Sequence, residues 1–474
     1  MHIARLAAIA LLALASFLGV RDLHAATIVI VNQNAPRVGF NDPTPVTPVG
    51  GNPGVTLGAQ RLFAFQHAAD IWGATLTSSV PIRIGASFVP LACDTGSAVL
   101  GAAGANYVVS DFPAAPIPGT WYPVALGEKL AATALIPATE PHVIARFNSR
   151  LGLFPDCVPG LTFYLGLDNN AGDGIDLVTT LLHEIAHGLG FQTFTDDTTG
   201  AQLQGVPSIW DHYLVDNARE RTWVQMTDAE RVASAIVWRG LSWNGAQVTA
   251  AAPGVLAPTS RLGIDGPAAG GAAGTYAIGD ASFGTPVGAQ PLKGQLMPVI
   301  DQSNGAGLAC TPLDATNTLA VRGNVALVDR GTCDFVVKAR HVQAAGAIAM
   351  IVADNVDGGV AGLPGSDPAI TITSARVTRA DGVALKAALQ GRSRTRSGVV
   401  ANLVSDTTQL AGADVRGRVL MYTPSVNSPG SSVSHYTTEA RPNLLMEPSI
   451  NDDLRHVVAP PGDLTLPLLR DIGW

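Results

Sequence analysis

Residues 176–191 read DLVTTLLHEIAHGLGF and carry a strong helical signal. The apolar positions recur three or four residues apart: Leu177, Val178, Leu181, Leu182, Ile185 and Leu189. That period is typical of one face of an α-helix. Gly188 and Gly190 are natural stopping residues, because glycine readily adopts the backbone conformation that ends a helix. The spacing therefore predicts a helix from about Leu177 to Gly190.

Three polar side chains interrupt this apolar helix: His183, Glu184 and His187. Residues four apart lie on one face of a helix, so both imidazoles can reach one zinc ion at about 2.0–2.1 Å. Glu184 sits beside the first ligand, where it can act on a zinc-bound water rather than bind the metal. The alternative is a chance HExxH run on a core helix, which would bury three polar groups without a partner, at a cost. The pattern favours one catalytic Zn²⁺ bound by His183 and His187, with Glu184 as the catalytic residue.

A catalytic zinc ion needs a third protein ligand and an open position for water. The compact metzincin pattern would place a histidine at position 193, where this chain has Thr193. Much farther along, His435 precedes the run from Pro442 to Pro448, PNLLMEP, which contains Met446. The gap after His187 is 435 − 187 = 248 residues, and a folded insert closes such a gap at little entropic cost. His435 is therefore the predicted third ligand.

A histidine followed by a methionine in a proline-flanked turn resembles the third ligand and Met-turn of the leishmanolysin-like metzincins. The similarity is tight over residues 176–191 and 434–448, and residues 464–474 also resemble the C-terminus of bacterial secreted members. The resemblance implies an α+β zincin catalytic domain with Met446 as an apolar floor beneath the metal. Several metzincins have a tyrosine two residues after this methionine, where this chain has Pro448.

The resemblance implies a zinc metalloendopeptidase that hydrolyses peptide bonds in proteins or peptides. Zinc would polarise the scissile carbonyl, and Glu184 would take a proton from the zinc-bound water and return it to the leaving amine. Two alternatives stay open. One is a zincin of another class with an acidic third ligand, Glu220 or Glu230; the other is a non-enzymatic secreted binding protein. Glu184 counts against the second, because a structural zinc site has no need of a base.

A second unit is indicated by residues 326–335, ALVDRGTCDF, and 344–347, AAGA. Their strand–helix–strand order implies a small α/β unit, and the residues resemble the protease-associated (PA) domain. We expect this PA domain over residues 275–405, inserted into the catalytic domain, whose two parts are residues 27–250 and 406–474. Residues 250–274, rich in Ala, Gly and Pro, have the composition of a linker. The expected fold class is α/β overall.

The first residues have the layout of a secretory signal peptide. Arg5 precedes an apolar run from Leu6 to Val20, and a small residue, Ala25, follows at a plausible cleavage point. We therefore expect residues 1–25 to be removed and the protein to be secreted, with no membrane span elsewhere. The formal net charge of −8 would repel nucleic acid, so protein or peptide substrates are the expected partners.

The four cysteines fit an exported protein. An even number in an oxidising compartment predicts two disulfides, although four cysteines allow three pairings. The simplest pairing joins Cys93 to Cys157 and Cys310 to Cys333. The loop Asp168–Gly174 has many side-chain oxygen atoms, so a Ca²⁺ site is one interpretation of it. The favoured interpretation is a turn capped by Asp and Asn side chains.

Overall fold

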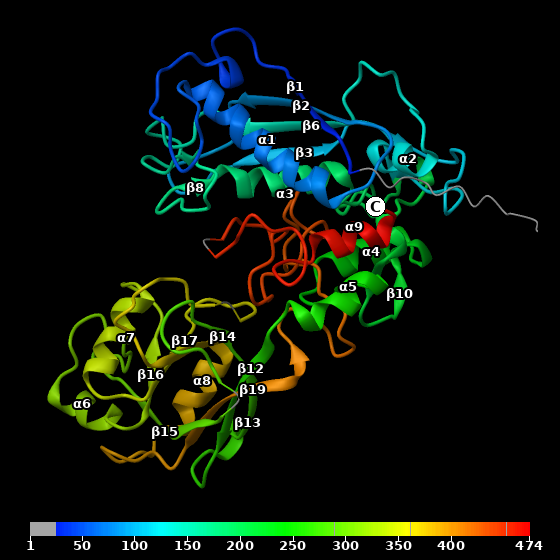
Figure 1. Cartoon of the computed structure of the whole chain (residues 1–474). Coiled ribbons are helices and arrows are strands. Elements are labelled where there is room, and N and C mark those ends of the chain that lie inside the picture. The colour runs from blue at the N-terminus through cyan, green and yellow to red at the C-terminus, as the bar shows by residue number, and fades with distance from the viewer. Residues whose placement is uncertain (1–24, 289, 361, 452) are drawn as a thin grey trace, which may run out of the picture.

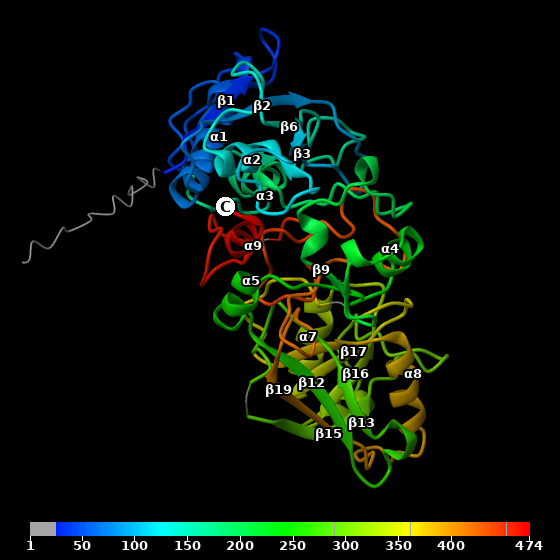
Figure 2. The ribbon, with the colours of Figure 1, turned by 90° about the vertical axis from the view of Figure 1, so that its right-hand side faces the viewer.

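The computed structural model describes residues 25–288, 290–360, 362–451 and 453–474. The signal peptide predicted over residues 1–25 lies outside the described residues, except for Ala25. Figures 1 and 2 show two lobes, one formed by the N-terminal and C-terminal segments and the other by the middle of the chain. Helices and several sheets are combined, which confirms the α/β class. No described helix is long and apolar enough to cross a membrane.

The first lobe is built on a four-stranded sheet in the order β1-β2-β6-β3. Its strands are β1 (Ile28–Asn32), β2 (Ile82–Val89), β3 (Gly101–Ala105) and β6 (Val143–Asn148). The first three strands of that order are parallel, and β3 is antiparallel to β6 and lies at the edge. Shorter elements join them: β4 (Val108–Val109), β5 (Tyr122–Pro123), α2 (Val124–Ala131), β7 (Phe163–Tyr164) and β8 (Ile175–Asp176).

Two helices pack beside this sheet, α1 (Leu57–Thr75) and α3 (Leu177–Leu189) (Figure 1). The structure thus confirms the helix predicted from the HExxH run. It begins at Asp176, whose side chain accepts a 2.7 Å hydrogen bond from the backbone N–H of Thr179, and this cap satisfies a donor that the first turn leaves free. It ends at Gly190, whose φ of +123° suits glycine alone. All thirteen residues of α3 are buried, so its polar side chains lie inside the protein.

The C-terminal segment completes the same core. Apolar residues from both ends of the chain, such as Phe65, Leu181, Met446 and Ile472, belong to one continuous buried cluster. The elements that flank the insert are β9 (Leu214–Asp216), β10 (Arg221–Thr222), α4 (Asp228–Ala235), β11 (Leu241–Trp243), α5 (Ala246–Ala251) and α9 (Thr465–Ile472).

The second lobe is an eight-stranded sheet in the order β13-β12-β19-β15-β16-β17-β18-β14. Its strands are β12 (Pro258–Asp265), β13 (Gly274–Ala277), β14 (Gly279–Asp280), β15 (Leu292–Pro298), β16 (Val325–Asp329), β17 (Ala349–Ala353), β18 (Thr373–Val377) and β19 (Val400–Leu410). Its helices are α6 (Ala315–Val321), α7 (Phe335–Ala344) and α8 (Arg379–Ala388). Strands β15 to β18 are parallel, and two apolar cores accompany the sheet.

The predicted linker over residues 250–274 is wrong. Strand β12 lies in this stretch and pairs with β19 in an antiparallel ladder that joins Pro258 to Leu410. The chain therefore enters and leaves the second lobe side by side, at the points where the first lobe is interrupted. Such adjacent ends let a folded unit be inserted without separating the two parts of its host.

Both predicted disulfides are present. Cys93 is bonded to Cys157 beside the sheet of the first lobe, and Cys310 is bonded to Cys333 in the second. Each bond stays within one lobe, which agrees with two separately folded units.

Candidate metal centre

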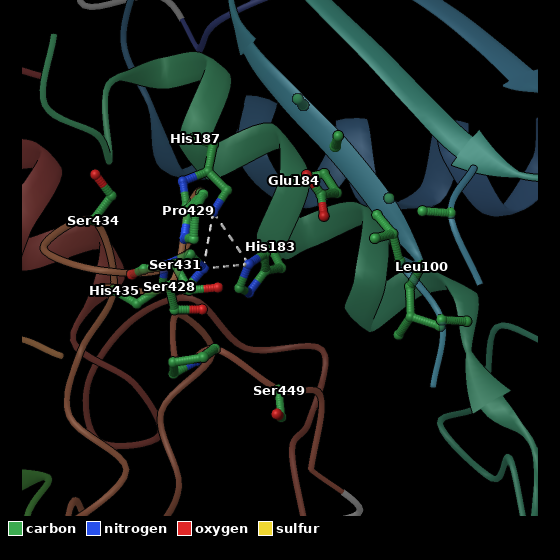
Figure 3. A pocket seen from close by; sticks show the side chains of 18 of the residues that line it. Leu100, His183, Glu184, His187, Ser428, Pro429, Ser431, Ser434, His435 and Ser449 are labelled. Atoms are coloured by element: carbon green, nitrogen blue, oxygen red, sulfur yellow. Dashed lines mark hydrogen bonds between the residues drawn. The ribbon is translucent and has the colours of Figure 1, made fainter. Parts of the chain in front are cut away.

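Three histidine side chains converge at the centre of the first lobe. His183 and His187 lie one turn apart on α3, and His435 lies on the C-terminal segment (Figure 3). Each Nε2 atom is 3.2 Å from the other two, and all three residues are buried. Among the described residues, this is the one group of His, Cys, Asp or Glu side chains placed to share a metal ion.

The position of His435 depends on a short piece of paired backbone. Its carbonyl oxygen accepts a 2.8 Å hydrogen bond from the N–H of Tyr422, and the carbonyl of Tyr422 accepts one from Val433. Met421 and Tyr436 form an isolated antiparallel bridge beside these bonds. The segment is therefore held as a narrow ladder although it contains no named strand.

The hydrogen bonds made by the three Nδ1 atoms show which nitrogen of each ring carries the proton. The Nδ1 atoms of His183, His187 and His435 lie 2.7, 2.7 and 2.8 Å from the carbonyl oxygens of Leu445, Phe191 and Ser431. A carbonyl oxygen can only accept, so each neutral ring carries its proton on Nδ1. All three Nε2 atoms then present lone pairs to one another with no proton between them.

This arrangement fits a tetrahedral cation. Two nitrogen ligands about 2.05 Å from zinc lie about 3.3 Å apart, close to the 3.2 Å observed. Burial lowers the pKa of His183 to about 4 and, with the nearby His183, that of His187 to about 3. Burial also holds the pKa of His435 well below its ordinary value. The rings are thus neutral near pH 7, the form that binds a metal.

Glu184 lies beside the cluster and lines the same cavity (Figure 3). Burial raises the pKa of its carboxyl group to about 8, and a hydrogen bond from the backbone of Ala103 opposes that rise. Strand β3 passes very close: a Cβ atom placed on Gly101 would lie 2.9 Å from Cγ of Glu184. Glycine at this position therefore leaves the space that the carboxylate occupies.

The turn around Met446 supports the first histidine. Met446 is fully buried, and its carbonyl oxygen accepts a 2.8 Å hydrogen bond from the N–H of Tyr436. The neighbouring Leu445 provides the acceptor for His183, and its own N–H donates to Asp463 at 2.7 Å. The turn thereby fixes the ring orientation of a residue on another element, the kind of support that metal ligands commonly require.

The acidic alternatives lie elsewhere. Glu220 pairs with Arg416 at 2.8 Å, and Glu230 caps α4 and pairs with Arg221. Neither glutamate lines the cavity that contains the histidines. Thr193 lies near the cluster, but its hydroxyl donates to the buried carboxylate of Asp211 at 2.7 Å.

The cavity around the three histidines, hereafter the cleft, has a volume of 1380 Å³. One wall is the edge strand β3, and the opposite wall comes from residues 428–435 and 448–450. Its described lining includes the acidic residues Asp94, Glu184, Asp196 and Asp197 but no Lys or Arg. Pro448, at the position where several metzincins have a tyrosine, is part of the wall.

The loop considered for calcium is organised by its own side chains. Asp168 accepts hydrogen bonds from the hydroxyl of Tyr164 at 2.6 Å and from the N–H of Asn170 at 3.2 Å. Asn169 joins the loop to the C-terminal segment through the carbonyl oxygen of Leu454. These contacts match the turn with Asx caps that the composition favoured.

Several supporting groups were not predicted. The acceptors for the three Nδ1 atoms are backbone carbonyls, which have no residue signature in a sequence. Asp463, which holds Leu445, stands just before α9 and looks like an ordinary helix cap. Only the finished fold brings these groups to the histidines.

One comparison with known proteins concerns a defined part of the second lobe. Residues 292–385 match the model of the PA domain. The chain is 53% identical over 45 residues to the ER degradation-enhancing alpha-mannosidase-like protein 3 of Xenopus laevis, a match covering 10% of this chain and 5% of that protein. It is 34% identical over 97 residues to the probable lipoprotein aminopeptidase LpqL of Mycobacterium tuberculosis, covering 20% of this chain and 19% of that protein. The chain thus spans a small part of either relative.

Two solved structures show weak likeness. A zinc aminopeptidase from Bacillus subtilis is 21% identical, with a TM-score of 0.22 and coverage of 33% of both chains. An aminopeptidase from Aneurinibacillus is 19% identical, with a TM-score of 0.22 and coverage of 42% of this chain and 41% of that one. Neither likeness extends to the whole fold. The firm assignment is local: the second lobe contains a PA domain, over residues 292–385.

Proposed function

We propose that this chain is a secreted zinc metalloendopeptidase, a leishmanolysin-like metzincin interrupted by its PA domain. The observation that carries the proposal is the convergence of three Nε2 lone pairs, 3.2 Å apart, beside a buried glutamate. Such lone pairs repel one another unless a cation lies between them. We assign His183, His187 and His435 as its ligands.

A zinc ion held there would polarise the scissile carbonyl and lower the pKa of a coordinated water from about 15.7 towards 7. The chain's own contribution to proton transfer is Glu184, whose carboxylate oxygen would accept the proton of the attacking water. The same oxygen would then return it to the nitrogen of the leaving amine. Burial raises the pKa of Glu184, whereas a nearby cation would favour the ionised form that a base requires.

Strand β3 is suited to hold the substrate. It is the edge of its sheet, and Gly101, Ala102 and Ala103 line the cleft. An edge strand presents N–H and C=O groups that an extended peptide can pair with. The cleft volume of 1380 Å³ also exceeds the roughly 300–1,000 Å³ of small-molecule sites. Both features support cleavage within a polypeptide.

Other observations agree with this assignment. The two disulfides suit an oxidising compartment, and hence export. The relative named as an aminopeptidase favours peptide chemistry, although it would imply removal of N-terminal residues. Digestion of casein with and without a chelator, together with an N-acetylated peptide, separates these activities. We expect chelator-sensitive cleavage of both substrates; an aminopeptidase would leave the acetylated peptide intact, and a non-enzymatic protein would cleave neither.

A further inference from the structure

A second cavity lies where the two lobes meet. Its volume is 780 Å³, and we call it the lateral pocket. The first lobe contributes Trp238, Arg239 and residues of the segment 438–455, and the second contributes residues of β12, β14 and the segment 362–366. Figure 1 shows the C-terminal segment between the sheet of the first lobe and the PA domain.

A single stretch of chain, residues 447–451, lines both the lateral pocket and the cleft, and we call it the dividing segment. Pro448 and Ile450 line the cleft, whereas Glu447 and Asn451 line the lateral pocket, and Ser449 lines both. This stretch forms bends rather than a strand, and its curved path lets neighbouring residues reach both cavities. The two cavities are therefore neighbours along this stretch and share Ser449 as a lining residue.

The dividing segment is tied to the metal centre. A carboxylate oxygen of Glu447 accepts a 2.9 Å hydrogen bond from the N–H of Leu444, and the other accepts one from the side chain of Asn451 at 3.2 Å. These bonds close the turn in which Leu445 holds the ring of His183. The position of the dividing segment therefore affects both the cleft wall and a proposed zinc ligand.

The lining of the lateral pocket combines an aromatic surface with polar groups. Trp238 is 46% exposed, and a Cβ atom on Gly359 would lie 2.9 Å from its Nε1, so this glycine lets the indole lie against the PA domain. Arg441 pairs with Asp280 at 3.1 Å across the boundary between the lobes. The buried Oδ1 of Asp280 has no hydrogen-bond partner within the described part of the chain. An exposed aromatic ring in a cavity that also has polar groups is typical of a surface that binds peptide.

We propose that the lateral pocket binds a stretch of the polypeptide substrate that lies outside the residues held in the cleft. This inference rests on the proposed peptidase function and names a further site for its substrate. The occupant is an extended peptide with an apolar side chain that packs on Trp238. Because Ser449 lines both cavities, a peptide bound in the cleft lies within reach of the lateral pocket, and the pocket volume is in the range of ligand sites.

The test compares a short and a long peptide. An internally quenched hexapeptide is measured beside a peptide of about twenty residues, up to roughly 70 Å when extended, with the same six residues at its centre. Ser366→Trp fills the lateral pocket from an exposed position in the PA domain. Ser303→Trp, also exposed in that lobe but lining neither cavity, is the matched control. Trp238→Ala removes the aromatic surface by a second route.

We expect Ser366→Trp and Trp238→Ala to lower kcat/KM for the long peptide by about tenfold and to leave the hexapeptide and the Ser303→Trp control unchanged. Equal effects on both peptides, or no effect on either, would overturn the inference. A pocket that binds a small ligand instead of substrate would give one of these two outcomes. If the wild-type chain cleaves neither peptide, the proposed function fails separately. In that case, fluorescence anisotropy of the labelled long peptide measures its binding to the lateral pocket directly. Weaker binding by both pocket variants than by the wild type supports the site, and equal binding rejects it.

Discussion

The Nδ1 atom of His183 donates a 2.7 Å hydrogen bond to the carbonyl oxygen of Leu445, a residue 262 positions farther along the chain. This contact joins α3 to the turn that contains Met446. It orients the ring so that Nε2 faces the other two histidines. The contact can form because the two parts of the first lobe, which the PA domain separates in the chain, pack into one core.

Replacing Glu184 with glutamine should abolish hydrolysis while leaving zinc bound. Glutamine keeps the size and shape of the side chain but cannot accept the proton of the attacking water. We expect casein digestion to fall by about 10²–10⁴-fold, the usual contribution of a general base. Zinc content and the unfolding temperature should match those of the wild type. Digestion at a near-native rate would remove Glu184 from the mechanism.

Replacing Gly101 with alanine should disturb the same glutamate from the side of β3. The added Cβ atom would lie 2.9 Å from Cγ of Glu184, so the carboxylate must move. We expect kcat to fall about tenfold, since small displacements of a catalytic group are costly. Gly104→Ala is the control in the same strand, because its Cβ would meet only the flexible amide of Gln192, at 3.3 Å. Equal kcat values for the two variants would contradict this account.

Acid should lower the stability of the PA domain by protonating Asp354. Its side chain is only 4% exposed and contacts Arg330, at 2.9 Å, and Arg376. Burial tends to raise the pKa of this carboxyl group, but hydrogen bonds from the two arginines, together with those from the backbone N–H groups of Val356 and Asn355, outweigh it and lower the pKa from 3.8. The stabilisation is therefore complete above pH 3.8 and is lost as the pH falls through the lower folded pKa.

Asp354→Asn should thus lower the free energy of unfolding by about 3 kcal/mol at pH 7, because two buried or half-buried cations lose their partner. The difference from wild type should shrink below pH 3.8. Asp357→Asn is the control, since Asp357 is 84% exposed in its pair with Arg379, and little change is expected. Denaturant titrations between pH 3 and 7 measure both. A pH-independent difference would exclude the charge as the source of stability.

The sequence predicted features that depend on nearby residues. The period of α3, its terminating glycine and the strand–helix–strand order of the PA domain are local, and the structure has each of them. Strand β12 was missed because its composition resembles a linker, and what makes it a strand is its ladder with β19, a pairing that joins Pro258 to Leu410. The lateral pocket was missed for the same reason, since its walls come from segments far apart in the chain.

Within the candidate site, the histidines and the glutamate could be predicted from the sequence. The groups that hold these side chains in position could not. His435 could be proposed because a methionine turn follows it. The carbonyl oxygens of Phe191, Ser431 and Leu445 could not, because every residue has one and only the fold selects these three. The same holds for Gly101, whose importance depends on how closely β3 passes Glu184.

The central claim is that His435 completes a zinc site with His183 and His187, and zinc content measured by mass spectrometry tests it most directly. Wild-type protein dialysed after loading should retain about one zinc ion per chain. His435→Ala should lose that ion. Its zinc affinity should fall by more than the roughly 10–100-fold that is typical of changes to groups that only support a ligand. Glu220→Ala and Glu230→Ala should retain it, because their carboxylates pair with arginines away from the cleft. Full zinc retention by a folded His435→Ala variant, with loss in either glutamate variant, would contradict the account.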